Sequence, residues 1–258
     1  MKKALQFGWL FLRSPSKAAA ACADNRALRD ALAVYGLTLL TAAAFQHFKP
    51  FDFPDANAAL PAGAQGLLFW LKVMLWQPVL MAFLIGFTGA LLHWMKDGWL
   101  PLKVFTAFFW AAIPAILMVV YLPTQSGPSL LTKLQFRILF ALWSAGSAYA
   151  MLQVPRGLWR PLASLLLVMN AVQLITYFPE TIVTIMRWEA GYKGVVGIAG
   201  FWMLFAGALG LKHLPPARPL PRAVLPLLFA LVLQIEVVFA AFLLDWLPVE
   251  TLKALLYG

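Results

Sequence analysis

The stretch AVLPLLFALVLQIEVVFAAFLLDWL, residues 223–247, decides the fold class of this chain. Apart from Glu236, it contains no charged residue until Asp245 near its end. About 20 consecutive apolar residues in a helix are enough to cross the hydrocarbon core of a membrane. The stretch therefore predicts a membrane-spanning helix that is long enough to tilt.

The rest of the chain has the same apolar character. Of its 258 residues, 62% are hydrophobic and 12% are charged, whereas a soluble domain carries about 25% charged residues. The mean hydropathy is +0.81. This composition excludes a soluble globular enzyme, a disordered tail and a disulfide scaffold, and it indicates an integral membrane protein.

Helix length and hydropathy together predict the number of spans. Tryptophans near the expected span ends, among them Trp70, Trp143 and Trp246, are typical of interfacial anchors. We expect an all-α, polytopic transmembrane helical bundle of about seven spans, a five-helix core plus two. The candidate spans are residues 30–48, 67–95, 101–122, 134–153, 160–178, 194–211 and 223–247.

Loop cations predict the orientation, because cytoplasmic loops of membrane proteins carry an excess of Lys and Arg. With the N-terminus inside, 13 of the 20 Lys and Arg residues lie on the cytoplasmic side and 7 lie on the other side. This bias predicts a cytoplasmic N-terminus and, with seven spans, an external C-terminus, in what we expect to be a bacterial cytoplasmic membrane. If residues 194–211 do not span, the C-terminus lies inside.

Residues 4–12, before the first span, predict a short amphipathic helix. Leu5, Trp9 and Leu12 recur at helical spacing between basic flanks. This pattern is typical of an interfacial helix on an anionic membrane leaflet, and a helix that simply packs on the bundle is an equal alternative. The expected lipid-facing basic anchor consists of Lys2, Lys3, Arg13 and Lys17.

We divide the chain into three parts. Residues 1–29 form the basic, amphipathic N-terminal segment, residues 30–178 form the five-helix membrane core, and residues 179–258 form an interfacial helix, a Pro-rich linker and one or two further spans.

The third part is expected to differ from a simple bundle. Ile182, Ile185 and Met186 have helical spacing, which predicts a half-buried interfacial helix over residues 179–193. Five prolines in residues 212–226 predict a stiff, extended spacer. The spacer makes the last span an appended helix.

Glu236 is the candidate functional residue within a span. A lone carboxylate at that depth is costly unless it is paired, hydrated or protonated. Glu236 is therefore either an ion or proton site or a structural hydrogen-bonding group, and we favour the structural interpretation. The other members of this candidate intramembrane polar site are Gln234, Asn170, Gln173 and Gln77.

Catalytic and metal-binding motifs are absent from the sequence. His47, His93 and His213 are scattered, the single cysteine is Cys22, and no HExxH, CxxC, Walker or GxSxG motif occurs. We therefore expect no catalytic residue, no metal and no cofactor, and the topological bias of the charge argues against a nucleic-acid partner.

Two predicted spans carry a family resemblance. FTAFFWAAIPAILMVVYLP (105–123) has aromatic and small residues before Pro114, and ILFALWSAGSAYAML (138–152) has a Leu-Trp…Tyr pattern through Trp143 and Tyr149. With Ser14-Pro15 ahead of the first span, residues 1–178 resemble the Yip (Ypt-interacting protein) domain family. The resemblance implies a five-span, non-catalytic membrane core, and eukaryotic members of that family act in vesicle traffic with small GTPases.

Two functional classes follow from these observations. The first is a non-catalytic integral membrane protein that acts through helix packing and through partner or lipid contacts, as in Yip-like membrane organisation or an accessory subunit. Its expected partners are membrane lipids, including anionic headgroups, and a protein partner or a second copy of the chain is the alternative. The second class is a transporter or channel component that uses Glu236.

Overall fold

The computed structural model describes residues 2–50, 53, 66–122, 129–215 and 218–257. Within these ranges the chain is helical and contains no strand. The helices are α1 (Lys2–Arg13), α2 (Pro15–Ala21), α3 (Ala27–Phe48), α4 (Leu67–Met74), α5 (Trp76–Trp94), α6 (Leu100–Tyr121), α7 (Lys133–Leu152), α8 (Arg156–Val168), α9 (Ala171–Ile185), α10 (Glu189–His213), α11 (Pro221–Leu243) and α12 (Val249–Tyr257).

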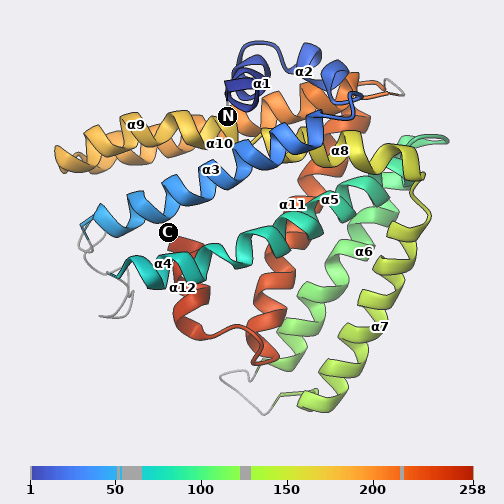
Figure 1. Cartoon of the computed structure of the whole chain (residues 1–258). Coiled ribbons are helices and arrows are strands. Elements are labelled where there is room, and N and C mark those ends of the chain that lie inside the picture. The colour runs from blue at the N-terminus through green and yellow to red at the C-terminus, as the bar shows by residue number, and fades with distance from the viewer. Residues whose placement is uncertain (1, 51–52, 54–65, 123–128, 216–217, 258) are drawn as a thin grey trace.

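The helices form two groups, which meet where α8 packs against α5, α10 packs against α11 and α3 packs against α4 (Figure 1). In one group α3, α9 and α10 lie together, and α1 and α2 cover one end of them. In the other group α5, α6, α7 and α11 pack beside one another, and α12 turns back toward α4.

Six helical stretches in the described part are long and apolar enough to cross a membrane. Together they agree with six of the seven predicted spans. Helix α7 covers the remaining one, residues 134–153, and is not among the six, because Lys133, Gln135 and Arg137 occupy its first turns. The six stretches are Ala27–Phe48, Leu67–Trp94, Leu100–Tyr121, Arg156–Ile185, Glu189–His213 and Pro221–Leu243.

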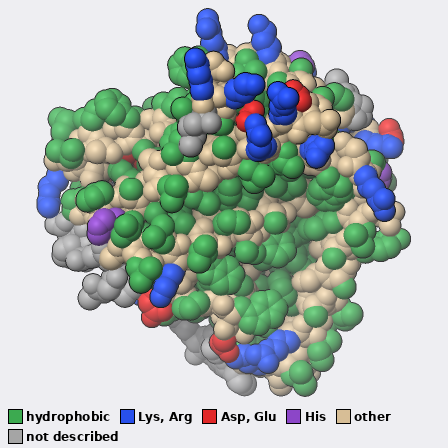
Figure 2. Space-filling model, in the orientation of Figure 1, with side chains coloured by type: hydrophobic (Ala, Val, Ile, Leu, Met, Phe, Trp, Pro, Cys, Tyr) green, Lys and Arg blue, Asp and Glu red, His purple; other side chains and the backbone are tan. Residues whose placement is uncertain are grey.

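The outer surface of the helices is apolar over a wide band (Figure 2). On α6, for example, Phe105, Phe108 and Ile116 are each about 60% exposed. Continuous apolar surface on this scale requires an apolar surrounding phase or a partner. Lys and Arg side chains gather instead at the end covered by α1 and α2 (Figure 2). The chain therefore has the surface of an integral membrane protein.

The expected interfacial helix over residues 179–193 is not a separate element. Helix α9 continues through Pro179 to Ile185, and α10 begins at Glu189. Between them Arg187 adopts a left-handed conformation with φ of 50°, which reverses the chain so that α9 and α10 pack against each other. Periodicity alone did not reveal this reversal, because both halves of the segment are helical.

The expected spacer over residues 212–226 is shorter than predicted, and the last span is not appended. Helix α11 begins at Pro221, where the missing N–H of proline costs no hydrogen bond. The α11 side chains Leu227 and Leu233 are buried, and α11 packs against α5, α6 and α10. Arg222 also donates hydrogen bonds to the carbonyls of Lys96 and Gly98. Helix α11 therefore lies within the assembly.

Helix α1 packs on the bundle through a face that sequence spacing did not single out. Phe7 and Phe11 are buried, and at Gly8 an added Cβ would lie 3.2 Å from the Cβ of Ala171. Leu5 and Trp9, two of the residues that predicted the amphipathic pattern, point outward and are 44% and 60% exposed. The helix is fixed to the protein on one side and keeps apolar side chains on the other.

Candidate functional site: a lateral cavity between three helices

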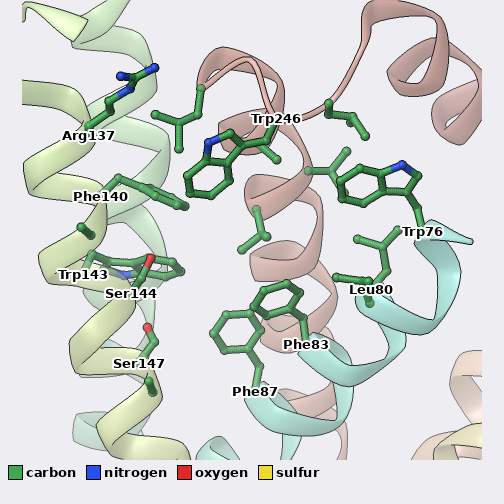
Figure 3. A pocket seen from close by; sticks show the side chains of 18 of the residues that line it. Trp76, Leu80, Phe83, Phe87, Arg137, Phe140, Trp143, Ser144, Ser147 and Trp246 are labelled. Atoms are coloured by element: carbon green, nitrogen blue, oxygen red, sulfur yellow. The ribbon is translucent and has the colours of Figure 1, made fainter. Parts of the chain in front are cut away.

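A cavity of about 700 Å³ lies between α5, α7 and α11 (Figure 3). Its walls consist mostly of aromatic and aliphatic side chains, and Arg137 is the one charged residue among the described residues that line it. The principal lining residues are Trp76, Leu80, Phe83 and Phe87 on α5, Arg137, Phe140, Ala141, Trp143, Ser144, Ser147 and Ala148 on α7, Val237, Val238 and Ala241 on α11, and Trp246 and Leu247 after it.

Helical periodicity places these side chains in the cavity. On α5 residues 76, 80, 83 and 87 form one stripe, and on α7 residues 137, 140, 144, 147 and 151 form another. Helix α7 begins after a capping box in which Gln135 N–H donates to Thr132 Oγ1 (3.3 Å) and Thr132 N–H donates to Gln135 Oε1 (2.9 Å). The cap fixes the start of α7 and thereby the position of Arg137, one turn into the helix.

The position of Trp246, which follows α11 and lines the cavity, depends on a left-handed residue at the end of that helix. Asp245 has φ of 62°, and Trp246 N–H donates to the carbonyl of Ala241 at 2.9 Å. Aspartate tolerates this conformation better than most residues that carry a side chain. The chain turns back at this point and brings Trp246 to the cavity (Figure 3).

Trp143 holds α6 and α7 together behind the cavity. Its indole Nε1 donates to the carbonyl of Trp110 at 3.1 Å. This carbonyl has no helical N–H partner, because residue 114, four positions later, is a proline. Trp110 Nε1 in turn donates to Ser147 Oγ at 3.1 Å. Trp143 is 5% exposed, so the expectation that it is an interfacial anchor is wrong, and Pro114 creates the acceptor that holds it.

One end of the cavity is charged. Lys133, four residues before Arg137, forms a hydrogen-bonded ion pair with Asp245. This hydrogen bond, together with the positive charges of Lys133 and then Arg137, holds the pKa of Asp245 below its usual value. The carboxylate is thus ionised at neutral pH. The Lys133–Asp245 pair lies near Arg137 but outside the described lining of the cavity, where Arg137 is the charged residue.

The walls of the cavity are suited to binding a largely apolar molecule. Its apolar lining can accommodate hydrocarbon, and the hydroxyl groups of Ser144 and Ser147 lie along the α7 wall (Figure 3). In the part of the chain that the structure describes, no three His, Cys, Asp or Glu side chains come together as metal ligands. A ligand with an apolar body and one anionic group is complementary to these walls.

The predicted intramembrane polar residues are not brought into this cavity. Glu236 is half-buried on α11, and its Oε2 is buried without a hydrogen-bond partner among the residues that the structure describes. Gln234 is half-buried on the same helix, and Gln77 is half-buried in the first turn of α5. None of the three lines the cavity between α5, α7 and α11.

Asn170 and Gln173 lie elsewhere, at the junction of α8 and α9. The Asn170 side-chain amide donates to the carbonyls of Leu166 (3.2 Å) and Leu167 (3.1 Å), and the backbone carbonyl of Asn170 accepts a hydrogen bond of 3.3 Å from the Thr38 hydroxyl on α3. The carbonyl of Gln173 accepts from Thr176 at 3.0 Å. These contacts are structural: they cap the break between two helices and join it to a third.

A second cluster of polar side chains, which the sequence did not predict, lies at the C-terminal end of α3. Lys49 Nζ donates to the hydroxyl of Tyr192 at 3.2 Å and lies 5.1 Å from the centroid of that ring. Burial lowers the pKa of Lys49, and the negative charge of buried Glu180 opposes this shift. In the sequence, Lys49 directly follows the first predicted span, residues 30–48, and Glu180 falls in the expected interfacial helix over residues 179–193. The available signal was that Glu180 stands three residues after Tyr177 in an apolar helical run.

The four predicted N-terminal cations, Lys2, Lys3, Arg13 and Lys17, are all exposed. They lie on α1 and α2, at the end of the molecule where basic side chains gather (Figure 2).

No protein-family model, no curated protein and no solved structure matches this chain. The resemblance to the Yip family therefore rests on the helix patterns quoted above.

Proposed function

We propose that this protein is a non-catalytic integral membrane protein that binds an acyl-chain amphiphile from the membrane, with the chain in the lateral cavity and an anionic headgroup at Arg137. The observation that carries the proposal is a cavity of about 700 Å³ whose lining is apolar except at one end. Ligand cavities of about 300–1,000 Å³ accommodate small molecules of this class.

The topology that accompanies this proposal has seven spans. Helix α7 packs against α5 and α6, and its basic first turns lie near the end of α11 through the Lys133–Asp245 pair. With α7 as the fourth span, the N-terminus is cytoplasmic, the C-terminus is external, and the cavity's charged end faces the outer surface of a bacterial cytoplasmic membrane. Arg137 can extend from a span end toward the headgroups, as long basic side chains do.

Arg137→Gln tests the headgroup contact. Hydrogen bonds to charged groups contribute about 1.5–3 kcal/mol, so we expect at least about a tenfold loss of anionic amphiphile that co-purifies in mild detergent. The measurement is quantitative mass spectrometry of lipid extracts per mole of protein. Lys72→Gln is the matched control, because Lys72 is exposed on α4 and does not line the cavity. Equal loss in both variants would contradict the assignment of Arg137.

A second candidate function, proton or ion transport, is favoured by the buried and unpartnered Oε2 of Glu236 within the described residues. A transporter predicts that Glu236→Gln removes proton movement into proteoliposomes, followed with an enclosed pH-sensitive dye, while expression and folding stay normal. Gln234→Ala is the control on the same helix. Wild-type protein that moves no protons would exclude this candidate for protons.

A further inference from the structure

A second hollow, of about 610 Å³, opens at the surface where α1 meets α2. It lies at the end of the molecule where Lys and Arg side chains gather (Figure 2), far from the charged end of the lateral cavity. The chain passes from one helix to the other at Ser14, and Pro15 starts α2. The lining residues are Gln6, Trp9, Leu10, Arg13, Ser14 and Lys17.

The polar groups of this hollow are complementary to a phosphate. Arg13 and Lys17 contribute two cations, and no Asp or Glu is among the described residues that line the hollow. The guanidinium group of arginine matches phosphate oxygens with paired donors, and a lysine ammonium adds a mobile positive charge. The hydroxyl of Ser14 and the amide of Gln6 provide further hydrogen-bonding groups on the same walls.

The apolar groups of the hollow indicate that the phosphate belongs to a lipid. Trp9 and Leu10 form part of the wall, and Trp9 is largely exposed, as is Leu5 one turn before it. Tryptophan is enriched at the membrane interface, where its ring contacts the glycerol and upper acyl region and its N–H remains near the headgroups. A free phosphate ion has no apolar surface that could pack against Trp9 and Leu10.

The packing of α1 keeps this surface in place. Its opposite face, with Ala4, Phe7 and Phe11, is buried against the bundle, and the close approach at Gly8 leaves little room for rotation. The hollow is thus a fixed surface on a folded protein, and it does not need a helix to form on the membrane.

We propose that the α1–α2 hollow binds the phosphate headgroup of an anionic phospholipid, with the phosphate at Arg13 and Lys17 and the glycerol and acyl region along Trp9 and Leu10. The site is separate from the lateral cavity, shares no lining residue with it, and lies at the opposite end of the molecule. Arg13 of α1 and Lys17 of α2 thereby belong to a binding site of defined shape, and not only to a general positive surface charge.

The test compares two charge-matched variants of the full-length protein. Arg13→Gln with Lys17→Gln removes two cations from the hollow, and Lys2→Gln with Lys3→Gln removes two cations from the opposite end of α1, outside the hollow. Native mass spectrometry measures the binding of phosphatidylglycerol and of phosphatidylcholine to each protein. We expect about thirty-fold weaker phosphatidylglycerol binding in the Arg13/Lys17 variant, from the contribution of each basic residue at an anionic surface, and a much smaller loss in the Lys2/Lys3 variant.

Thermal unfolding and a further control variant show whether a loss of lipid binding comes from the hollow itself. Both pairs of side chains are exposed, so the thermal unfolding of both variants should match that of the wild type. Lys72→Gln removes an exposed cation of α4 that lines neither cavity, and it should leave the preference for phosphatidylglycerol unchanged. Equal losses in the two charge-matched variants would overturn the proposal in favour of general surface charge. Tight binding of soluble glycerol phosphate, or no preference of the wild type for the anionic lipid, would also overturn it.

Discussion

Replacing both Ala141 and Ala148 by phenylalanine is expected to remove the acyl-chain ligand from the protein. Both alanines lie on the α7 wall of the lateral cavity, so two phenyl rings would occupy the space between α7, α5 and α11. Excluding as few as two CH₂ groups of a bound chain costs about 1.6 kcal/mol. We therefore expect a decrease of more than about tenfold in co-purified amphiphile per mole of protein.

A control on the same helix separates occupation of the cavity from a general effect on α7. Leu142 is 65% exposed and does not line the cavity, so Leu142→Phe adds a ring of the same kind to the outer face. It should retain the wild-type amount of amphiphile. If the double variant retains as much amphiphile as Leu142→Phe does, the lateral cavity is not the binding site.

Trp143→Ala is expected to lower the free energy of unfolding by about 3–5 kcal/mol, the range for removing a buried large aromatic side chain. Trp143 lies 5.5 Å from Phe140 and 6.1 Å from Phe87 between ring centroids, and its indole satisfies the Trp110 carbonyl that Pro114 leaves without a partner. The alanine variant loses this packing and also leaves the Trp110 carbonyl without this hydrogen-bond partner.

Reversible unfolding in mixed micelles measures this difference, with Trp99→Ala as the control because Trp99 is 71% exposed. Trp143→Phe should lie between wild type and Trp143→Ala, since it keeps a ring but loses the hydrogen bond and part of the indole packing. Wild-type stability of Trp143→Ala would show that the contact between α6 and α7 does not depend on this residue.

Hydropathy was sufficient to locate most helices, because the length and apolar content of a span are properties of a continuous segment. The sixth predicted span, residues 194–211, lies within the 25-residue helix α10. Helix reversal at Arg187 was not predictable from the same signal, since hydropathy and periodicity are similar on both sides of the turn.

The lateral cavity was not predictable, because its walls come from segments at least 50 residues apart in sequence. In the sequence, Arg137 is one basic residue near the start of the predicted span over residues 134–153, and Trp143 was expected only to be an interfacial anchor. Their roles depend on Asp245, Pro114 and Trp110, which reach them through the packing of α6, α7 and α11. Glu236, by contrast, was predicted as a candidate functional residue because it is a charge in an apolar run, but it does not line the cavity.

Photolabelling with a fatty acid that carries a diazirine on its chain tests the central claim most directly. The full-length protein is irradiated in membranes that contain this probe, and the labelled peptides are mapped by mass spectrometry. Binding in the lateral cavity predicts that labels concentrate on Phe83, Phe140, Trp143 and Trp246, and that excess unlabelled fatty acid competes them away. Labelling confined to exposed outer residues such as Phe105 and Phe108, without competition, would contradict the account.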